Sequence, residues 1–127
     1  MRVEVNMVVS NAKEASDYYD KLLKAEIISK TDETTEMNET IMKLGNIEIR
    51  VLNENKEYGL IAPGEVGTGS LWLNLIVDDI EMFFDNVVRE GGKVISPIKD
   101  FPEIPAKNAV FSDKYNHVWV INQKYHK

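Results

Sequence analysis

The feature that most constrains how this chain can fold is an internal duplication. A strand-like segment, a pair of capping residue types and an amphipathic helix occur near the N-terminus and again about 68 residues later. In this register Val5 matches Leu73, Asn11 matches Asp79, and Ala25 lies close to the counterpart of Gly92. The 127 residues are therefore expected to contain two equivalent modules.

The first module is expected to run from a strand to a helix and then to three further strands. Apolar residues occupy every second position from Val3 to Val9, so one face of this strand should be buried. The helix follows the capping types Ser10 and Asn11, and its apolar residues recur at helical spacing. The predicted elements are a strand at 2–9, a helix at 11–24, and strands at 25–31, 38–44 and 47–52, with a tight turn at Gly45-Asn46.

The second module repeats this order after a long glycine-containing linker without periodicity, which is typical of a surface loop. Asp78 and Asp79 directly precede the second helix, so they are interpreted as capping residues rather than catalytic carboxylates. The predicted elements are a strand at 70–77, a helix at 79–91, and strands at 93–98, 108–112 and 117–122. We expect one domain over 1–127, with module one at 1–53, the linker at 54–69 and module two at 70–127.

The repeated β-α-β-β-β order predicts an α+β fold. Strands and helices do not alternate as they do in a parallel, doubly wound sheet, so mixed or antiparallel sheets are expected, each backed by a helix on one face. A ferredoxin-like fold or a plain α+β sandwich is the alternative. The duplication and the paired capping sites favour two equivalent modules.

Composition narrows the classes of function. No apolar run approaches the roughly 20 residues of a membrane-spanning helix and no signal-peptide segment is recognised, so a soluble, cytoplasmic protein without a membrane partner is expected. The net charge of −6 argues against a nucleic-acid partner, because phosphate backbones bind clustered Lys and Arg. Since the chain has no cysteine, any metal would have to bind through histidine or oxygen.

Two segments carry a family resemblance. SNAKEASDYYDKLLKAEI resembles an opening motif with a polar cap and a Tyr-Tyr pair in a helix, and LWLNLIVDDIEMFFDNVVREGGKVI with VFSDKYNHVWVI is similar to a second module and its closing strand. Over nearly the whole chain these motifs resemble the glyoxalase/bleomycin-resistance/dioxygenase (vicinal oxygen chelate) superfamily, in particular its PhnB-like branch. The resemblance implies two βαβββ modules forming a curled, cavity-enclosing mixed sheet with the helices outside, and it implies a homodimer.

The resemblance also implies where a divalent metal would be bound, and the residues at those positions do not suit one. The strand-one positions correspond to Glu4 and Trp72, and the strand-four positions correspond to Val120 in module two and to Glu48 or Arg50 in module one. Tryptophan and valine offer no metal donor here, and arginine is protonated and has no lone pair. We therefore expect no catalytic metal and no other cofactor.

The two histidines are not expected to supply the missing ligands. Strand alternation places His117 on the side of Trp119 and Ile121, away from the cavity, where a local hydrogen bond is the simpler role. His126 lies in the terminal tail, and we assign it no chemistry.

The cavity face that strand alternation predicts combines apolar and polar side chains, as small-molecule sites do. Trp72 is either a ligand anchor or a core tryptophan. Arg50 needs a carboxylate partner, which is either Glu4 or Glu48 in an internal ion pair or a group of the ligand. The predicted ligand-binding residues are Glu4, Asn6, Glu48, Arg50, Trp72, Asn74 and Val120, with Val8, Ile76 and Val118 beside them.

Three functions remain open at this point, and no residue is identified as catalytic. The first is metal-independent binding of a small molecule, as the resemblance to antibiotic-sequestering members of the superfamily implies. The second is a glyoxalase-type, metal-dependent lyase, isomerase or dioxygenase. The third is a structural or regulatory domain without chemistry. Several apolar or aromatic loop residues could have either of two roles: they close over the cavity, or they pack their loops against the body of the protein. These residues are Tyr58, Leu60, Ile61, Phe101 and Ile104.

Overall fold

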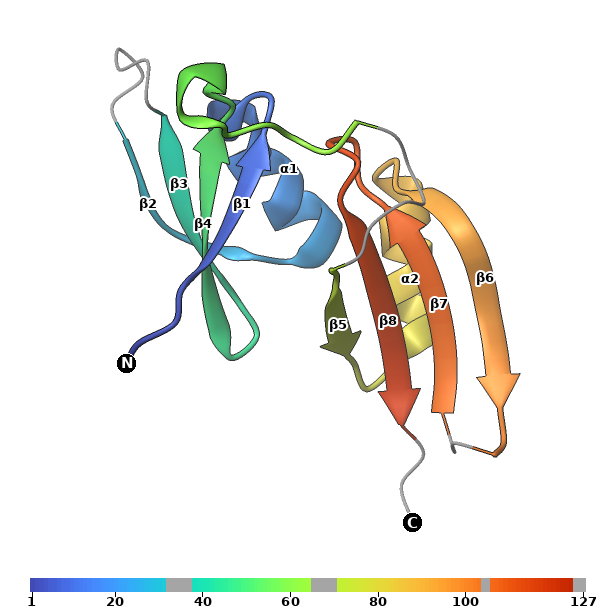
Figure 1. Cartoon of the computed structure of the whole chain (residues 1–127). Helices are drawn as coiled ribbons and strands as arrows, with labels where there is room; N and C mark the ends of the chain where they lie inside the picture. The colour runs from blue at the N-terminus through green and yellow to red at the C-terminus, as the bar shows by residue number, and fades with distance from the viewer. Residues whose placement is uncertain (32–37, 65–70, 104–105, 125–127) are drawn as a thin grey trace. The chain divides into compact units, whose positions relative to one another are not determined.

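The computed structural model describes residues 1–31, 38–64, 71–103 and 106–124 (Figure 1). The chain divides into two compact units, Met1–Pro63 and Gly64–Lys127. Over the described ranges, each unit has one α-helix and one four-stranded sheet. The two α+β modules predicted from the duplication are therefore confirmed.

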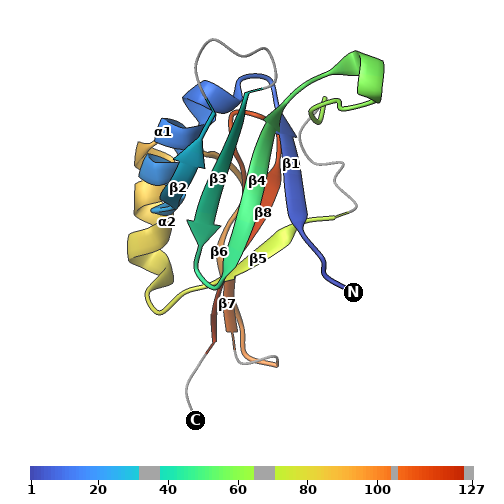
Figure 2. The same cartoon turned by 90° about the vertical axis from the view of Figure 1, so that its left-hand side faces the viewer.

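The first unit has the predicted β-α-β-β-β order. Its strands lie in the order β1-β4-β3-β2, with β1 parallel to β4 and the other neighbours antiparallel, and Figure 2 shows β1 and β2 at the edges of this sheet. The elements are β1 (Val5–Val9), α1 (Ala12–Leu23), β2 (Glu26–Lys30), β3 (Glu39–Leu44) and β4 (Ile47–Asn53), followed by a short 3-10 helix at Lys56–Tyr58.

One face of the first sheet packs against α1. Met7, Met42 and Ile49, from β1, β3 and β4, are buried, and so are Tyr19 and Leu22 from α1. Successive residues of a strand point to opposite faces, so the sequence neighbours of these strand residues lie on the other face. This second face, which we call the open face of the first sheet, carries the predicted ligand-binding residues Asn6, Glu48 and Arg50.

The second unit repeats the architecture. Its strands lie in the order β5-β8-β7-β6, with β5 parallel to β8 and the remaining neighbours antiparallel. The elements are β5 (Leu73–Ile76), α2 (Ile80–Arg89), β6 (Lys93–Phe101), β7 (Ala106–Ser112) and β8 (Val118–Lys124). Its core contains Phe111, Trp119 and Ile121 from the sheet and Ile80 and Val87 from α2, all buried.

Both helices begin at the capping residues that the sequence predicts. The Asn11 Oδ1 atom accepts a hydrogen bond from the Glu14 N–H at 3.1 Å, and the Asp79 Oδ1 atom accepts one from the Met82 N–H at 3.1 Å. Such caps satisfy backbone donors that the first turn of a helix leaves without a partner. The capping interpretation of Asp79 is confirmed.

A second acceptor at each helix start comes from the last strand of the same module. The Asn53 side-chain oxygen accepts from the Ala12 N–H at 2.6 Å, and the Gln123 side-chain oxygen accepts from the Ile80 N–H at 2.8 Å. The two contacts are equivalent under the duplication and tie the end of β4 to α1 and the end of β8 to α2. We call them the strand-to-helix caps.

The turn between β7 and β8 is built around the buried carboxylate of Asp113. Its Oδ1 atom accepts from the N–H groups of Tyr115 and His117 at 2.8 and 3.1 Å, and its Oδ2 atom accepts from the Trp119 Nε1–H at 2.9 Å. The backbone of His117 thus takes part in the turn, which agrees with the local role predicted for this residue.

Most differences between the predicted and observed elements lie at strand ends. The first strand begins at Val5 instead of residue 2, because its ladder with β4 starts at the pair Val5 and Ile49. β6 extends to Phe101 and includes Pro97. It is an edge strand with register irregularities between Ser96 and Lys99, where a residue without an N–H is tolerated.

In the part of the chain that the structure describes, no helix is both long enough and apolar enough to cross a membrane. The enclosure of a cavity by the two sheets, and their organisation as one domain, stay predictions.

Candidate functional site

Four of the seven predicted binding residues lie in the first unit, on or beside the open face of its sheet. Asn6 on β1 and Arg50 on β4 are partners across the parallel ladder. Glu48 lies two residues before Arg50 on the same strand, and Glu4 directly precedes β1. Met7, Ile49 and Val51, which alternate with these residues along β1 and β4, are buried, and this confirms the predicted alternation of faces.

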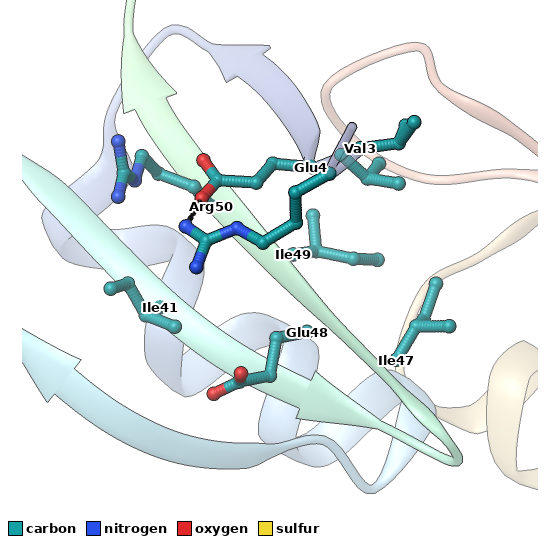
Figure 3. A pocket seen from close by; sticks show the side chains of 9 residues that line it. Val3, Glu4, Ile41, Ile47, Glu48, Ile49 and Arg50 are labelled. Atoms are coloured by element: carbon teal, nitrogen blue, oxygen red, sulfur yellow. Dashed lines mark hydrogen bonds and ion pairs between the residues drawn. The ribbon is translucent and has the colours of Figure 1, made fainter.

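A pocket of about 500 Å³ lies on this face (Figure 3). Sites for small organic molecules have volumes of roughly 300–1,000 Å³. Glu4, Glu48 and Arg50 are among its lining residues, whereas Asn6 lies outside this set. The lining also includes Arg2 and the apolar residues Val3, Val5, Ile41, Ile47 and Ile49. The pocket thus combines hydrophobic walls with a small number of charged groups.

The charged groups of the pocket are only partly paired with one another. The Arg2 guanidinium contacts the Glu4 carboxylate; the Arg2 side chain is largely accessible to solvent, and that of Glu4 is about half accessible. Arg50 Nε lies 4.0 Å from Glu39 Oε2, at the limit of an ion pair. Glu48 makes no ion pair with any described residue, and Figure 3 shows its carboxylate directed away from Arg50.

The internal partner considered for Arg50 differs from the one in the structure. Of the two alternatives, an internal ion pair with Glu4 or Glu48 or a group of the ligand, the internal pair is not formed: Glu4 is engaged by Arg2, and the nearby carboxylate is that of Glu39 on β3. The Arg50 Nε atom is buried and has no hydrogen-bond partner in the described part of the chain. The arginine at the centre of this face is therefore held only weakly by the protein.

The other three predicted residues lie in the second unit. Trp72 is 49% exposed, so its interpretation as a core tryptophan is wrong; the core tryptophan of this unit is Trp119, at 1%. The Trp72 Nε1–H donates to Asn74 Oδ1 at 3.1 Å, which fixes the orientation of the exposed ring. Asn74 pairs with Val120 across the β5–β8 ladder, and Val120 is buried at 8% exposure.

The corresponding faces of the two sheets differ in charge. In the ladders, Asn6 pairs with Arg50 in the first unit and Asn74 pairs with Val120 in the second. The second sheet therefore has an uncharged side chain where the first has a guanidinium group. A further amide contact, between the Asn108 and Asn122 side chains at 3.0 Å, is also uncharged.

Six lining residues were not predicted as site residues: Arg2, Val3, Val5, Ile41, Ile47 and Ile49. Ile41 lines the pocket because β3 pairs antiparallel with β4 and places it opposite Arg50. The turn at Gly45-Asn46 predicts that β3 and β4 pair. The register of that pairing is also needed to predict that Ile41 lies opposite Arg50. Glu39 approaches Arg50 from the same strand, and Arg2 lines the pocket from a segment that has no regular structure.

The loop residues considered for covering a cavity have separate outcomes. Tyr58 and Ile61 are 69% and 63% exposed, so neither side chain packs its loop against the body of the protein. Leu60 takes part in an isolated antiparallel bridge with Asn55. Ile104 and His126 lie outside the described residues.

The residues at the metal positions implied by the family resemblance do not form a suitable donor set. Trp72 and Val120 offer no donor, and Arg50 carries a permanent positive charge. Within residues 1–31, 38–64, 71–103 and 106–124, no three His, Asp or Glu side chains are grouped so that they could hold one ion. No reaction step is therefore assigned to a metal.

A comparison with known families shows which family the chain belongs to. The model of the Glyoxalase/Bleomycin resistance protein/Dioxygenase superfamily matches residues 3–121. The chain belongs to this superfamily. No curated protein matches it.

Solved structures of the same fold include proteins from several bacteria. TioX from Micromonospora sp. ML1 is 14% identical, with a TM-score of 0.76 and coverage of 98% of this chain and 99% of that one. A mutant of the fosfomycin resistance protein FosX from Listeria monocytogenes, complexed with Mn(II) and 1S,2S-dihydroxypropylphosphonic acid, is 10% identical, with a TM-score of 0.76 and coverage of 98% and 90%. FosX from Mesorhizobium loti is 13% identical, with a TM-score of 0.71 and coverage of 95% and 89%. At these identities the likeness shows the fold alone.

Proposed function

We propose that this protein binds a small organic molecule in the pocket on the open face of the first sheet, without a catalytic metal. The observation that carries the proposal is the pocket of about 500 Å³, which combines apolar walls with Glu48 and Arg50. Hydrophobic walls orient and desolvate a ligand, and a few polar groups fix its position. Glu4, which lines the pocket, and Asn6, which pairs with Arg50 in the ladder, are proposed as further contacts.

In the second unit, Trp72 and Asn74 are proposed as contacts for planar, uncharged groups. The exposed ring of Trp72 offers a surface for stacking, and its hydrogen bond to Asn74 orients it before a ligand arrives. Val120 is proposed as an apolar contact on the adjacent strand.

The chemistry of the side chains supports the absence of a metal from this proposal. A metal ion in this superfamily would polarise substrate oxygens, and this requires several donor atoms around one ion. The corresponding positions here hold Glu4, Trp72, Val120 and the strand-four pair Glu48 and Arg50. Only Glu4 and Glu48 of these residues offer carboxylates, and Arg50 carries a positive charge that would repel a cation.

A metal-dependent lyase, isomerase or dioxygenase is the second candidate. The finding that favours it is the structural likeness to FosX, which was solved with Mn(II). This candidate requires donors that the described residues do not group together.

A fragment screen in the presence of a chelator tests the proposed function. Backbone amide resonances of ¹⁵N-labelled protein should move in β1 and β4 when a fragment binds, and Ile41→Trp should abolish these shifts by filling the pocket. Ile28→Trp is the matched control, because Ile28 is an exposed apolar residue of the same sheet outside the pocket lining. If no fragment moved these resonances at millimolar concentration, the proposed function would be wrong.

We also propose that the protein is a cytoplasmic homodimer of the PhnB-like branch. The dimer is supported by the edge strands β1 and β5, whose backbone groups would benefit from cover by a second copy. Light scattering should give twice the monomer mass of 14.5 kDa at micromolar concentration. A mass equal to that of the monomer would contradict this assembly.

A further inference from the structure

We infer that the ligand of the first-sheet pocket is a small organic anion, and that Arg50 binds its carboxylate. This inference rests on the proposed function and adds the chemical class of the ligand. It starts from the hydrogen bonds that the Arg50 guanidinium group lacks.

A guanidinium group carries five N–H donors in one plane. No hydrogen bond joins the Arg50 side chain to any described residue, and its Nε atom is shielded from solvent as well. The side chain is 39% exposed, so the terminal nitrogens have access to the pocket that Arg50 lines. A buried donor without a partner lowers stability unless another group supplies the acceptor.

The protein carboxylates around Arg50 do not supply that acceptor. The closest one, Glu39, is 4.0 Å away, too far for a hydrogen bond, and its side chain is 35% exposed. Glu4 is engaged by Arg2, and Glu48 points elsewhere (Figure 3). An exposed pair of this kind contributes little, since solvent screens it and both side chains lose freedom. The guanidinium group is thus available to an incoming anion.

The duplicated module shows that the sheet does not require an arginine here. Val120 occupies the corresponding ladder position in the second unit, where it pairs with Asn74 as Arg50 pairs with Asn6. An arginine whose Nε–H donor is buried without an acceptor is costly compared with valine. Recognition of a ligand oxyanion accounts for this difference between the two modules.

A carboxylate matches the available donors in both geometry and charge. Two of its oxygens can accept parallel hydrogen bonds from one edge of the guanidinium group, and such charge-assisted pairs are stronger than neutral ones. The apolar side chain of Ile41, which lies opposite Arg50 in the β3–β4 ladder and lines the pocket, then offers a surface for the organic part of the ligand. The expected ligand is therefore a small carboxylic acid with an apolar body.

Matched pairs of acids and amides test this inference. The dissociation constants of benzoate and benzamide, and of hexanoate and hexanamide, are measured for the wild-type protein, for Arg50→Gln and for Lys43→Gln. Lys43 is the control because it is a cation on β3 that lies outside the pocket lining. The ¹⁵Nε–H resonance of Arg50 in the wild-type protein gives a second readout that does not depend on a variant.

We expect the acids to bind at least about 10-fold more tightly than the amides. A hydrogen bond to a charged group contributes a free energy that corresponds to about this ratio of dissociation constants or more. Arg50→Gln should remove the difference, Lys43→Gln should retain it, and the acids should shift the Arg50 resonance. Equal binding of acids and amides to the wild-type protein would overturn the anion inference and leave the proposed function standing. Failure of all four compounds, together with an empty fragment screen, would overturn both.

Discussion

The carboxylate of Asp113 is the most heavily hydrogen-bonded side chain in the turn between β7 and β8. It is completely buried and accepts from two backbone N–H groups and from the indole of Trp119. In Asp113→Asn an amide NH₂ group replaces one of the two carboxylate oxygens. At least one of the N–H groups that now donate to Asp113 would then face another donor instead of an acceptor. We expect a loss of about 2–4 kcal/mol in the free energy of unfolding, measured by urea denaturation.

Asp85→Asn is the matched control for Asp113, because Asp85 is exposed on α2 of the same unit. Its free energy of unfolding should stay within about 0.5 kcal/mol of the wild-type value. If both variants lost equal stability, the buried network would not be the cause. The fluorescence of Trp119 reports on the same turn.

Lys24 follows α1 in a left-handed conformation, with φ 59°. A side chain with a Cβ atom is strained there, whereas Gly91, which follows α2, adopts φ 91° without a Cβ atom. Lys24→Gly should raise the free energy of unfolding by about 0.5–1 kcal/mol, since relief of strain exceeds the added freedom of the unfolded chain.

The control for Lys24 is Lys21→Gly, in the last turn of α1. Glycine in a helix lowers stability by about 1 kcal/mol, so thermal denaturation should shift in opposite directions for the two variants. A decrease for both would show that the left-handed position is not strained.

At the scale of elements, the strand-to-helix caps link the last strand of each module to its helix. Asn53→Ala and Gln123→Ala should each lower stability by about 1 kcal/mol, because an N–H at the first turn loses its acceptor. Hydrogen exchange locates the effect. Asn53→Ala should expose the first amides of α1 and leave α2 protected, and Gln123→Ala should do the reverse.

Each of these two variants serves as the control for the other. Loss of protection in both helices from one substitution would contradict the view that each module caps its own helix. Equal protection in all proteins would show that the two side-chain contacts contribute nothing.

The order of elements could be predicted because local signals specify it. Alternating apolar residues predicted β1, and the capping residues Asn11 and Asp79 predicted where both helices begin. The strand-to-helix caps could not be predicted, since each joins residues about 40 positions apart, Ala12 to Asn53 and Ile80 to Gln123. Nothing in the local sequence distinguishes these amides from other polar residues at strand ends.

The candidate site could be predicted only in part. Alternation placed Glu48 and Arg50 on the face opposite the buried residues of β4, because the period of a strand is fixed by its backbone. The carboxylate nearest to Arg50 was not predicted, since the approach of Glu39 depends on side-chain conformation as well as on strand register. The environment of Trp72 also depends on tertiary packing, which the strand pattern alone does not contain.

For the whole molecule, the central claim is that a member of this superfamily binds a small organic acid without a metal. The most direct test is isothermal titration of the tightest acid with EDTA, and then with Mn²⁺ or Zn²⁺ in place of the chelator. The dissociation constant should agree within about twofold in all three conditions, because Arg50 supplies the binding charge. Stoichiometric metal binding together with an affinity for the acid that rises about 10-fold or more with metal, and that Glu4→Gln abolishes, would contradict the account.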